Sequence, residues 1–98
     1  MFERRTYHVY IVTGRSLSRV LYIGVTSHLA ARIDAHRRTA VDGFTARYRL
    51  SKLVYAEAFV YVRDAIAREK QLKGWRRERK LALIDATNPH WAELRIGP

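Results

Sequence analysis

The sequence predicts an α/β chain of the α+β type, in which helices flank a three-stranded antiparallel sheet. Two runs rich in aromatic and β-branched residues, 7–13 and 20–26, are separated by the turn-like GRSLSR, and such a pair is typical of a hairpin. A third run, residues 52–61, follows a helical pattern and precedes others. The simplest layered arrangement packs these helices on the sheet. With 98 residues, 48% of them hydrophobic, the chain is expected to form a single domain, 1–98.

Tyr22 and Gly24 stand out in the second strand. The run VLYIGVT is otherwise apolar or β-branched, as in a buried strand, and a buried strand has no obvious use for a phenol beside a glycine. A hairpin register symmetric about Ser16 would place Tyr10 opposite Tyr22. This register predicts that the two phenols share one face of the sheet.

A helix is expected directly after the second strand. Ser27 is a suitable cap for it. The pattern over residues 28–38 places Leu29 and Ile33 one turn apart, which predicts that they form the buried stripe.

Two further helices are expected after the third strand. Asp64 favours the start of a helix over residues 65–75, and Gly74 ends or bends it. The next helix covers residues 77–87 and stops near Asn88-Pro89, because proline disfavours the helical conformation of the residue before it. The tail is then expected to pack on the core through Trp91, Leu94 and Ile96.

Charge indicates the class of partner. Nineteen lysines and arginines stand against nine acids, which gives a net charge of +10. Most of these cations are arginines, whose planar fork suits phosphate oxygens. A solvated charged face is the simpler interpretation, but so large an excess favours a polyanion, DNA or RNA, over a membrane surface.

Several classes of protein are disfavoured by composition. No apolar run approaches the roughly 20 residues of a membrane span, and the N-terminus lacks the apolar core of a signal peptide. We therefore expect a cytoplasmic protein that makes no use of a membrane. The absence of cysteine excludes disulfides and thiolate metal sites. The sequence does not predict an oligomeric state.

Glu69 is the most informative polar residue. On a helix that begins at Val62, it falls in the middle of the apolar arc that Ala65, Ile66 and Leu72 continue. A carboxylate directed at a core is costly unless it is paired or binds a cation. Two interpretations stay open, a buried salt bridge with an arginine and a metal ligand at the edge of the core.

The first helix gives a parallel case. Arg32 and His36 are four residues apart and so lie on one face, beside or within the stripe of Leu29 and Ile33. Alone, the histidine would be structural and the arginine a surface charge. Together, they are two polar residues where packing residues belong.

These residues make the sequence similar to the GIY-YIG nuclease domain, in particular to its small stand-alone members. The similarity is carried by HVYIV in the first strand, by YIG at residues 22–24, and by Arg32 and His36. It continues with KLVY, with AREKQLKGW, which contains Glu69, and with LALIDATNPHW, and so spans about Tyr7 to Trp91. The first motif departs from the family name, since His8-Val9-Tyr10 keeps only its tyrosine.

The resemblance implies a three-stranded antiparallel sheet and divalent-metal-dependent cleavage of DNA phosphodiesters. It assigns catalytic roles by position, and Gly24 would let the backbone and a helix approach closely. Glu69 would hold Mg²⁺ or Mn²⁺, and Arg32 would neutralise charge on the phosphate. The general base stays open between two tyrosines and a histidine, and the role of Asn88 is open as well. The inherited catalytic residues are Tyr10, Tyr22, Arg32, His36 and Glu69.

Binding of nucleic acid is expected to come from the basic segments 32–52 and 63–80. Such contacts with phosphate carry little sequence specificity, so the preferred nucleic-acid structure and the pathway, DNA repair or recombination, are not readable from the sequence. The alternative is a nucleic-acid-binding domain with weak catalysis or none. The cations expected to contact nucleic acid are Arg37, Arg38, Arg47, Arg49, Lys70, Lys73, Arg76 and Arg77.

Overall fold

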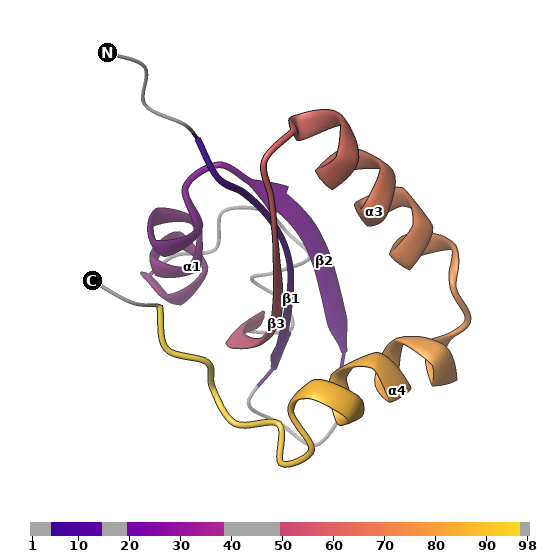
Figure 1. Cartoon of the computed structure of the whole chain (residues 1–98). Helices are drawn as coiled ribbons and strands as arrows, with labels where there is room; N and C mark the ends of the chain where they lie inside the picture. The colour runs from indigo at the N-terminus through magenta and orange to yellow at the C-terminus, as the bar shows by residue number, and fades with distance from the viewer. Residues whose placement is uncertain (1–4, 15–19, 39–49, 97–98) are drawn as a thin grey trace.

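The computed structural model describes residues 5–14, 20–38 and 50–96. Its elements, in order, are β1 (Tyr7–Gly14), β2 (Leu21–Thr26), α1 (Leu29–Arg38), β3 (Leu50–Phe59), α3 (Val62–Gly74) and α4 (Arg77–Thr87). The three strands form one antiparallel sheet in the order β2-β1-β3. Figure 1 shows α1 on one side of this sheet and α3 and α4 on the other. The predicted fold class is confirmed.

The register of the hairpin differs from the expected one. Tyr10 pairs with Gly24, and Val12 pairs with Tyr22, so the prediction that Tyr10 lies opposite Tyr22 was wrong by two residues. Because side chains alternate between the faces with a period of two, a shift of two residues keeps each side chain on its face. Tyr10 and Tyr22 therefore still share one face of the sheet.

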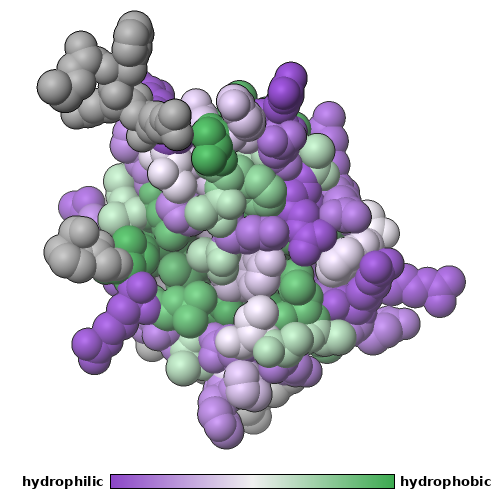
Figure 2. All heavy atoms as spheres, in the orientation of Figure 1, coloured by the Kyte–Doolittle hydropathy of each residue, from purple (hydrophilic) through white to green (hydrophobic). Residues whose placement is uncertain are grey.

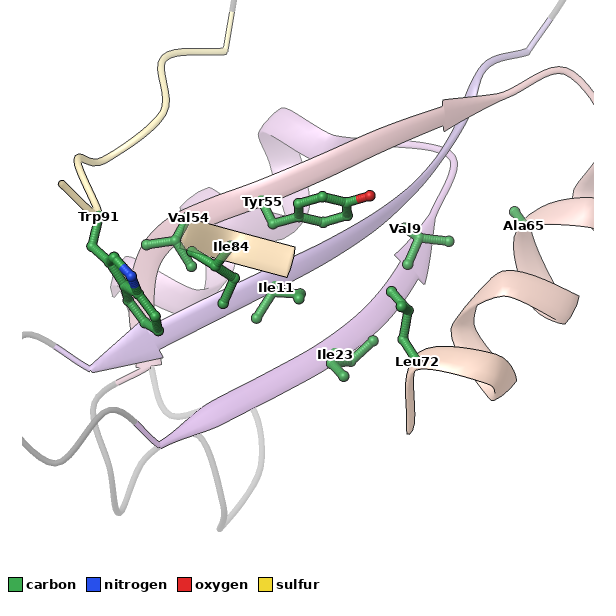
Figure 3. Close-up of a cluster of buried hydrophobic side chains, with 9 residues drawn as sticks. All are labelled: Val9, Ile11, Ile23, Val54, Tyr55, Ala65, Leu72, Ile84 and Trp91. Atoms are coloured by element: carbon green, nitrogen blue, oxygen red, sulfur yellow. The ribbon is translucent and has the colours of Figure 1, made fainter. Parts of the chain in front are cut away.

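The face that α3 and α4 cover is a continuous apolar core. Figure 3 shows Leu72 of α3 pointing toward the side chains of Val9 and Ile23. In the β1–β3 pairing, Ile11 pairs with Tyr55 but Val12 pairs with Leu53, so Val54 is an extra residue of β3. Because of this bulge, the consecutive residues Val54 and Tyr55 both join the apolar cluster on this face. The cluster consists of Val9, Ile11, Ile23, Val54, Tyr55, Ala65, Leu72, Ile84 and Trp91.

The opposite face packs against α1 and the C-terminal tail. Ile33 is fully buried there among Tyr10, Val12 and Leu53. Leu94 and Ile96 of the tail pack against the same group. This confirms the expected burial of Ile33.

Asn88 ties the end of α4 to the sheet and the tail. Its side-chain amide donates to the carbonyl oxygens of Val54 (3.2 Å) and Ala92 (2.8 Å), and its Oδ1 accepts from the amide of Ala92 (3.0 Å). The amide of Leu94 then donates to the carbonyl of Leu53 at 2.8 Å. The tail thus covers part of the free edge of β3, which could otherwise pair with another chain. Asn88 therefore has a structural role.

The remaining helices and strands are the predicted ones, although some begin or end at other residues than expected. Helix α4 has the predicted range. Strand β3 ends at Phe59, because Phe59 is the last residue paired with β1, while Val60 and Tyr61 project into solvent at 59% and 60% exposure. The predicted cap also differs, since the hydroxyl of Ser27 bonds to the ring of His28 at 2.9 Å. No helix among the described residues could span a membrane.

Candidate active site

Tyr10, Tyr22 and His36 form one ring cluster between the sheet and α1. The centroids of Tyr10 and Tyr22 lie 6.3 Å apart, and the ring of His36 stands edge-on to both, at 6.0 and 5.4 Å. A hydrogen bond of 3.3 Å joins the hydroxyl of Tyr10 to Nε2 of His36. The three polar rings come from β1, β2 and α1, and the outer two are 26 residues apart in the chain. They meet on the face of the sheet that packs against α1.

Small residues on both neighbouring strands make room for the ring of Tyr10. Gly24 is its partner on β2 and Ala56 its partner on β3. A Cβ atom at position 24 would lie 2.6 Å from the Tyr10 hydroxyl oxygen and 2.7 Å from its Cζ, too close for any side chain. The glycine therefore makes room for the ring of Tyr10. The expectation that it also lets a helix approach stays a prediction.

Arg32 lies one turn before His36 on α1 and is exposed. It lines a cleft of about 530 Å³ between α1 and the start of α3. Thr26, Ser27 and His28 form the polar part of the lining. Sequence reasoning considered Ser27 only as a helix cap and did not identify Thr26 or His28. Their one signal is their place between the YIG strand and the helix that carries Arg32.

Glu69 stands on the flank of α3 that turns toward this cleft. Val62, Ile66, Glu69 and Lys73 are spaced by four, three and four residues, so they form one stripe along the helix. Val62 and Ile66 line the cleft opposite Arg32, and Glu69 is the next side chain along. Its side chain is 17% exposed, and its carboxylate lies 3.5 Å from Nζ of Lys73.

An arginine that pairs with Glu69, one of the two interpretations left open by the sequence, is absent from the described residues. Lys73 is a weak substitute, because it is 54% exposed and pairs of this kind are screened by water. The apolar arc inferred for this helix is also narrower than predicted: Val62 and Ile66 are exposed at 45% and 38%, whereas Ala65 and Leu72 are buried. Glu69 thus sits at the margin of the core.

The other flank of α3 is fixed to β3 by a buried tyrosine and an ion pair. Nε of Arg68 and the hydroxyl of Tyr55 both donate to Oε1 of Glu57, each at 2.9 Å. Burial and the hydrogen bond to Glu57 raise the pKa of Tyr55. Arg68 also donates to Gln71 at 2.6 Å and lies 5.3 Å from the ring centroid of Trp75. Sequence reasoning did not identify this contact of Glu57 with Tyr55 and Arg68.

A divalent cation would find one suitable carboxylate here. Within residues 5–14, 20–38 and 50–96, no group of three or more histidines and acids could enclose a metal ion. Glu69 alone fits a hydrated Mg²⁺, an ion that commonly keeps several of its waters and binds through one or two carboxylates. Lys73 would have to release the carboxylate, which its exposure permits.

The predicted nucleic-acid contacts fall into three groups. Arg37 is paired with Glu93 at 2.6 Å, Arg38 with Asp34 at 2.5 Å, and Lys73 with Glu69. Hydrophilic side chains dominate the surface over α3 and α4 at the right of Figure 2. Lys70 of α3, Arg77 of α4 and Arg76, directly before α4, are exposed. Arg47 and Arg49 lie outside the described residues.

Comparison with known proteins identifies the family of the chain. Residues 6–82 match the family described as the GIY-YIG catalytic domain. A UPF0213 protein of Staphylococcus haemolyticus is 35% identical over 79 residues, which cover 81% of this chain and 94% of that protein. A UPF0213 protein of Staphylococcus aureus is 34% identical over the same shares.

One solved structure supports the fold. The solution NMR structure of a UPF0213 protein from Bacillus halodurans superposes with a TM-score of 0.58. The match covers 90% of this chain and 92% of that one at 23% identity. The arrangement of strands and helices is therefore shared.

Proposed function

Because the chain belongs to the GIY-YIG family of nuclease domains, we propose that it is a metal-dependent endonuclease that hydrolyses DNA phosphodiester bonds with little sequence specificity. The observation that carries the proposal is the ring cluster of Tyr10, Tyr22 and His36. Polar rings that meet at the edge of a core, one of them buried and two partly exposed, are well placed for proton transfer.

Arg32 is the residue that would hold the scissile phosphate. It is exposed, one turn from His36, and lines a cleft open to solvent. A guanidinium can donate to two phosphate oxygens at once, and its charge offsets the negative charge that grows in the transition state.

The three rings differ in exposure to solvent, and this difference assigns them different roles in proton transfer. Tyr10 is only 1% exposed, so its hydroxyl would act through His36, as a positioning residue that fixes the orientation of the imidazole. Tyr22 and His36 are both partly exposed and could reach a water molecule at the phosphate. The general base is therefore Tyr22 or His36, and imidazole is the side chain whose ordinary pKa lies near neutrality.

Glu69 would hold the divalent cation, Mg²⁺ or Mn²⁺. A bound cation of this kind supplies Lewis-acid polarisation of the phosphate and neutralises charge. The chain itself contributes the single carboxylate. Its exposed cations on and between α3 and α4, Lys70, Arg76 and Arg77, would bind the DNA backbone through its phosphates. We further propose a role in DNA repair or recombination, which suits cleavage that has little sequence specificity.

A second candidate function is a nucleic-acid-binding domain without catalysis, on DNA or RNA. The pairing of Glu69 with Lys73 favours it, because a carboxylate already neutralised by lysine binds a metal less well. The net charge of +10 serves binding in either case.

Incubation of the protein with a panel of labelled DNA and RNA structures distinguishes the two. Mg²⁺ or Mn²⁺ is supplied in one arm and removed by chelation in the other. The proposal expects metal-dependent cleavage of DNA by the natural chain and none by the Glu69→Gln variant. Binding without cleavage in every metal would support the second candidate, and preferential competition by RNA at fixed salt would make RNA its ligand.

A further inference from the structure

An exposed apolar patch lies where β3 leads into α3. Val60, Tyr61, Val62 and Ile66 are exposed at 59%, 60%, 45% and 38%, and they are the large apolar side chains most open to solvent among the described residues. Contiguous exposed apolar surface on a small, highly charged chain marks an interaction site. The mechanism proposed above makes no use of it.

The patch continues into the cleft that contains Arg32. Val62 and Ile66 form the wall of the cleft on α3, and Tyr7 and Val25 of the sheet lie between the helices. The wall on α1 is made of Ala31, Arg32 and Ala35, so two small residues flank the arginine. An apolar slot therefore opens beside the residue assigned to the phosphate.

We propose that this slot holds the unpaired base of a nucleic-acid strand whose phosphate lies on Arg32. This inference rests on the proposed function and adds a substrate class to it. A nucleobase is flat, largely apolar on its faces, polar on its edges and tied to an anion. This matches a slot lined by apolar side chains, by the polar residues Thr26, Ser27 and His28, and by one arginine. A base stacked and paired inside a duplex cannot enter it, so the preferred substrate carries a single-stranded, branched or unpaired segment.

Tyr61 extends the same surface as a stacking platform. Its ring is 60% exposed, and Cζ of Arg63 lies 5.5 Å from the ring centroid. An exposed aromatic ring beside an arginine is how proteins without sequence preference hold single strands. On the stripe of α3 that contains Val62 and Ile66, the acid is Glu69 and the cation is Lys73. The exposed cations Arg63 and Lys70 lie beside this stripe.

The net charge argues against a second copy of this chain on the patch. Each copy would bring a charge of +10, and like charges resist association. A polyanion gains from the same charge. The observations therefore favour a nucleic acid.

The test measures binding without cleavage. Fluorescence anisotropy at fixed salt, with all divalent metal chelated, compares a duplex with the same duplex carrying one unpaired nucleotide. The natural chain is expected to bind the unpaired form about 10-fold more tightly. Tyr61→Ala and Ile66→Ser should each reduce this preference, whereas Tyr61→Phe, which keeps the ring, should retain it. An abasic nucleotide at the unpaired position keeps the phosphate and should remove the gain.

Three results would overturn the inference. One is equal affinity for the two DNA forms, and another is an equal loss of affinity for both forms in Tyr61→Ala, with unchanged circular dichroism. The third is a dimer of the natural chain that Tyr61→Ala converts to monomer in sedimentation. This test is independent of the test for nuclease activity. A preference for unpaired DNA without cleavage in any metal would contradict only the proposed nuclease activity. Cleavage without such a preference would contradict only the proposed binding of a base in the slot.

Discussion

Each flank of α3 has a cation paired with a glutamate, Arg68 with Glu57 of β3 and Lys73 with Glu69 of α3 itself, and the two pairs are built differently. Toward β3, Glu57 accepts hydrogen bonds from Arg68 and Tyr55, both at 2.9 Å. Toward β2, Glu69 has Lys73 at 3.5 Å, on the next turn of its own helix. The first pair joins a strand to a helix, and the second joins a helix to itself.

This difference separates a structural carboxylate from an available one. A carboxylate held by two donors from different elements loses both bonds if it moves, so it fixes the helix on the sheet. A carboxylate paired with an exposed lysine four residues away gains little from that pairing. Glu69 can therefore exchange Lys73 for another cation at small cost, which is the property that a metal ligand requires.

Glu69→Gln should have the largest effect on activity. The substitution preserves the size of the side chain and removes its charge, so metal-dependent cleavage should fall about 10³-fold or more, as expected when several kcal/mol of charge stabilisation are lost. DNA binding should hold or tighten slightly, because a charge that repels phosphate is gone. Initial rates of cleavage on labelled DNA and binding under chelation measure the two effects.

The metal-free stability of the same variant gives an independent readout. Because Lys73 is 54% exposed, removal of its partner should change the free energy of unfolding by less than about 1 kcal/mol. A large decrease in melting temperature, or cleavage at the natural rate by the folded variant, would show that Glu69 is structural and would remove the single-carboxylate site.

Arg32→Lys should be the next most damaging change. Lysine keeps the charge but not the planar fork, so cleavage should decrease about 10²-fold, nearly as much as in Arg32→Ala. Arg32 is exposed, so neither variant should lose much stability. Single-turnover cleavage by the two variants, side by side, measures the difference. If lysine restores most of the rate, Arg32 supplies only a counter-charge.

The sequence predicted the elements well because their signals are local. The period of apolar residues and the Asn88-Pro89 stop predicted α4 with its observed range. The hairpin register was wrong by two residues, since the length of a turn does not specify pairing. The clustering of Tyr10 with Tyr22 survived this error because a shift of two leaves the faces unchanged.

Ion pairs between residues far apart in the chain could not be predicted from the sequence. The pairing of Arg37 with Glu93 joins residues 56 apart in the chain, and nothing local predicts it. The apolar period of α3 predicted that Ile66 would be buried, but the helix extends beyond the core and leaves that side chain exposed. A pattern identifies which residues share a face; only packing shows how much of that face is covered.

Glu57→Gln is the matched control for Glu69→Gln. The same chemical change on the other flank of α3 removes the charge that holds Arg68 and weakens two hydrogen bonds. We expect a loss of about 1–2 kcal/mol in stability, with the cleavage rate per folded molecule unchanged. Urea unfolding together with initial cleavage rates tests both. A stable Glu57→Gln variant without activity would reverse the assignment of the two flanks.

Tyr55→Phe should have the smallest effect and one that depends on pH. At neutral pH the variant loses one hydrogen bond to Glu57, at about 1 kcal/mol. Burial first, and then the bond to Glu57, raise the pKa of Tyr55 above its ordinary value of 10.0. The folded state therefore holds the phenolic proton more tightly than the unfolded state does. This contribution is complete below pH 10 and is lost as the pH rises through the folded pKa.

The melting temperature of the natural chain should consequently fall more steeply above pH 10 than that of Tyr55→Phe, so that the two curves converge. Thermal unfolding across this range measures the difference. Tyr61→Phe is the control, because it makes the same chemical change at a tyrosine that is 60% exposed and has no part in the contact between Tyr55 and Glu57. Parallel curves for Tyr55→Phe and the natural chain would mean that the Tyr55–Glu57 bond does not contribute to the attachment of α3, and Arg68 alone would then have to account for the difference between the two flanks.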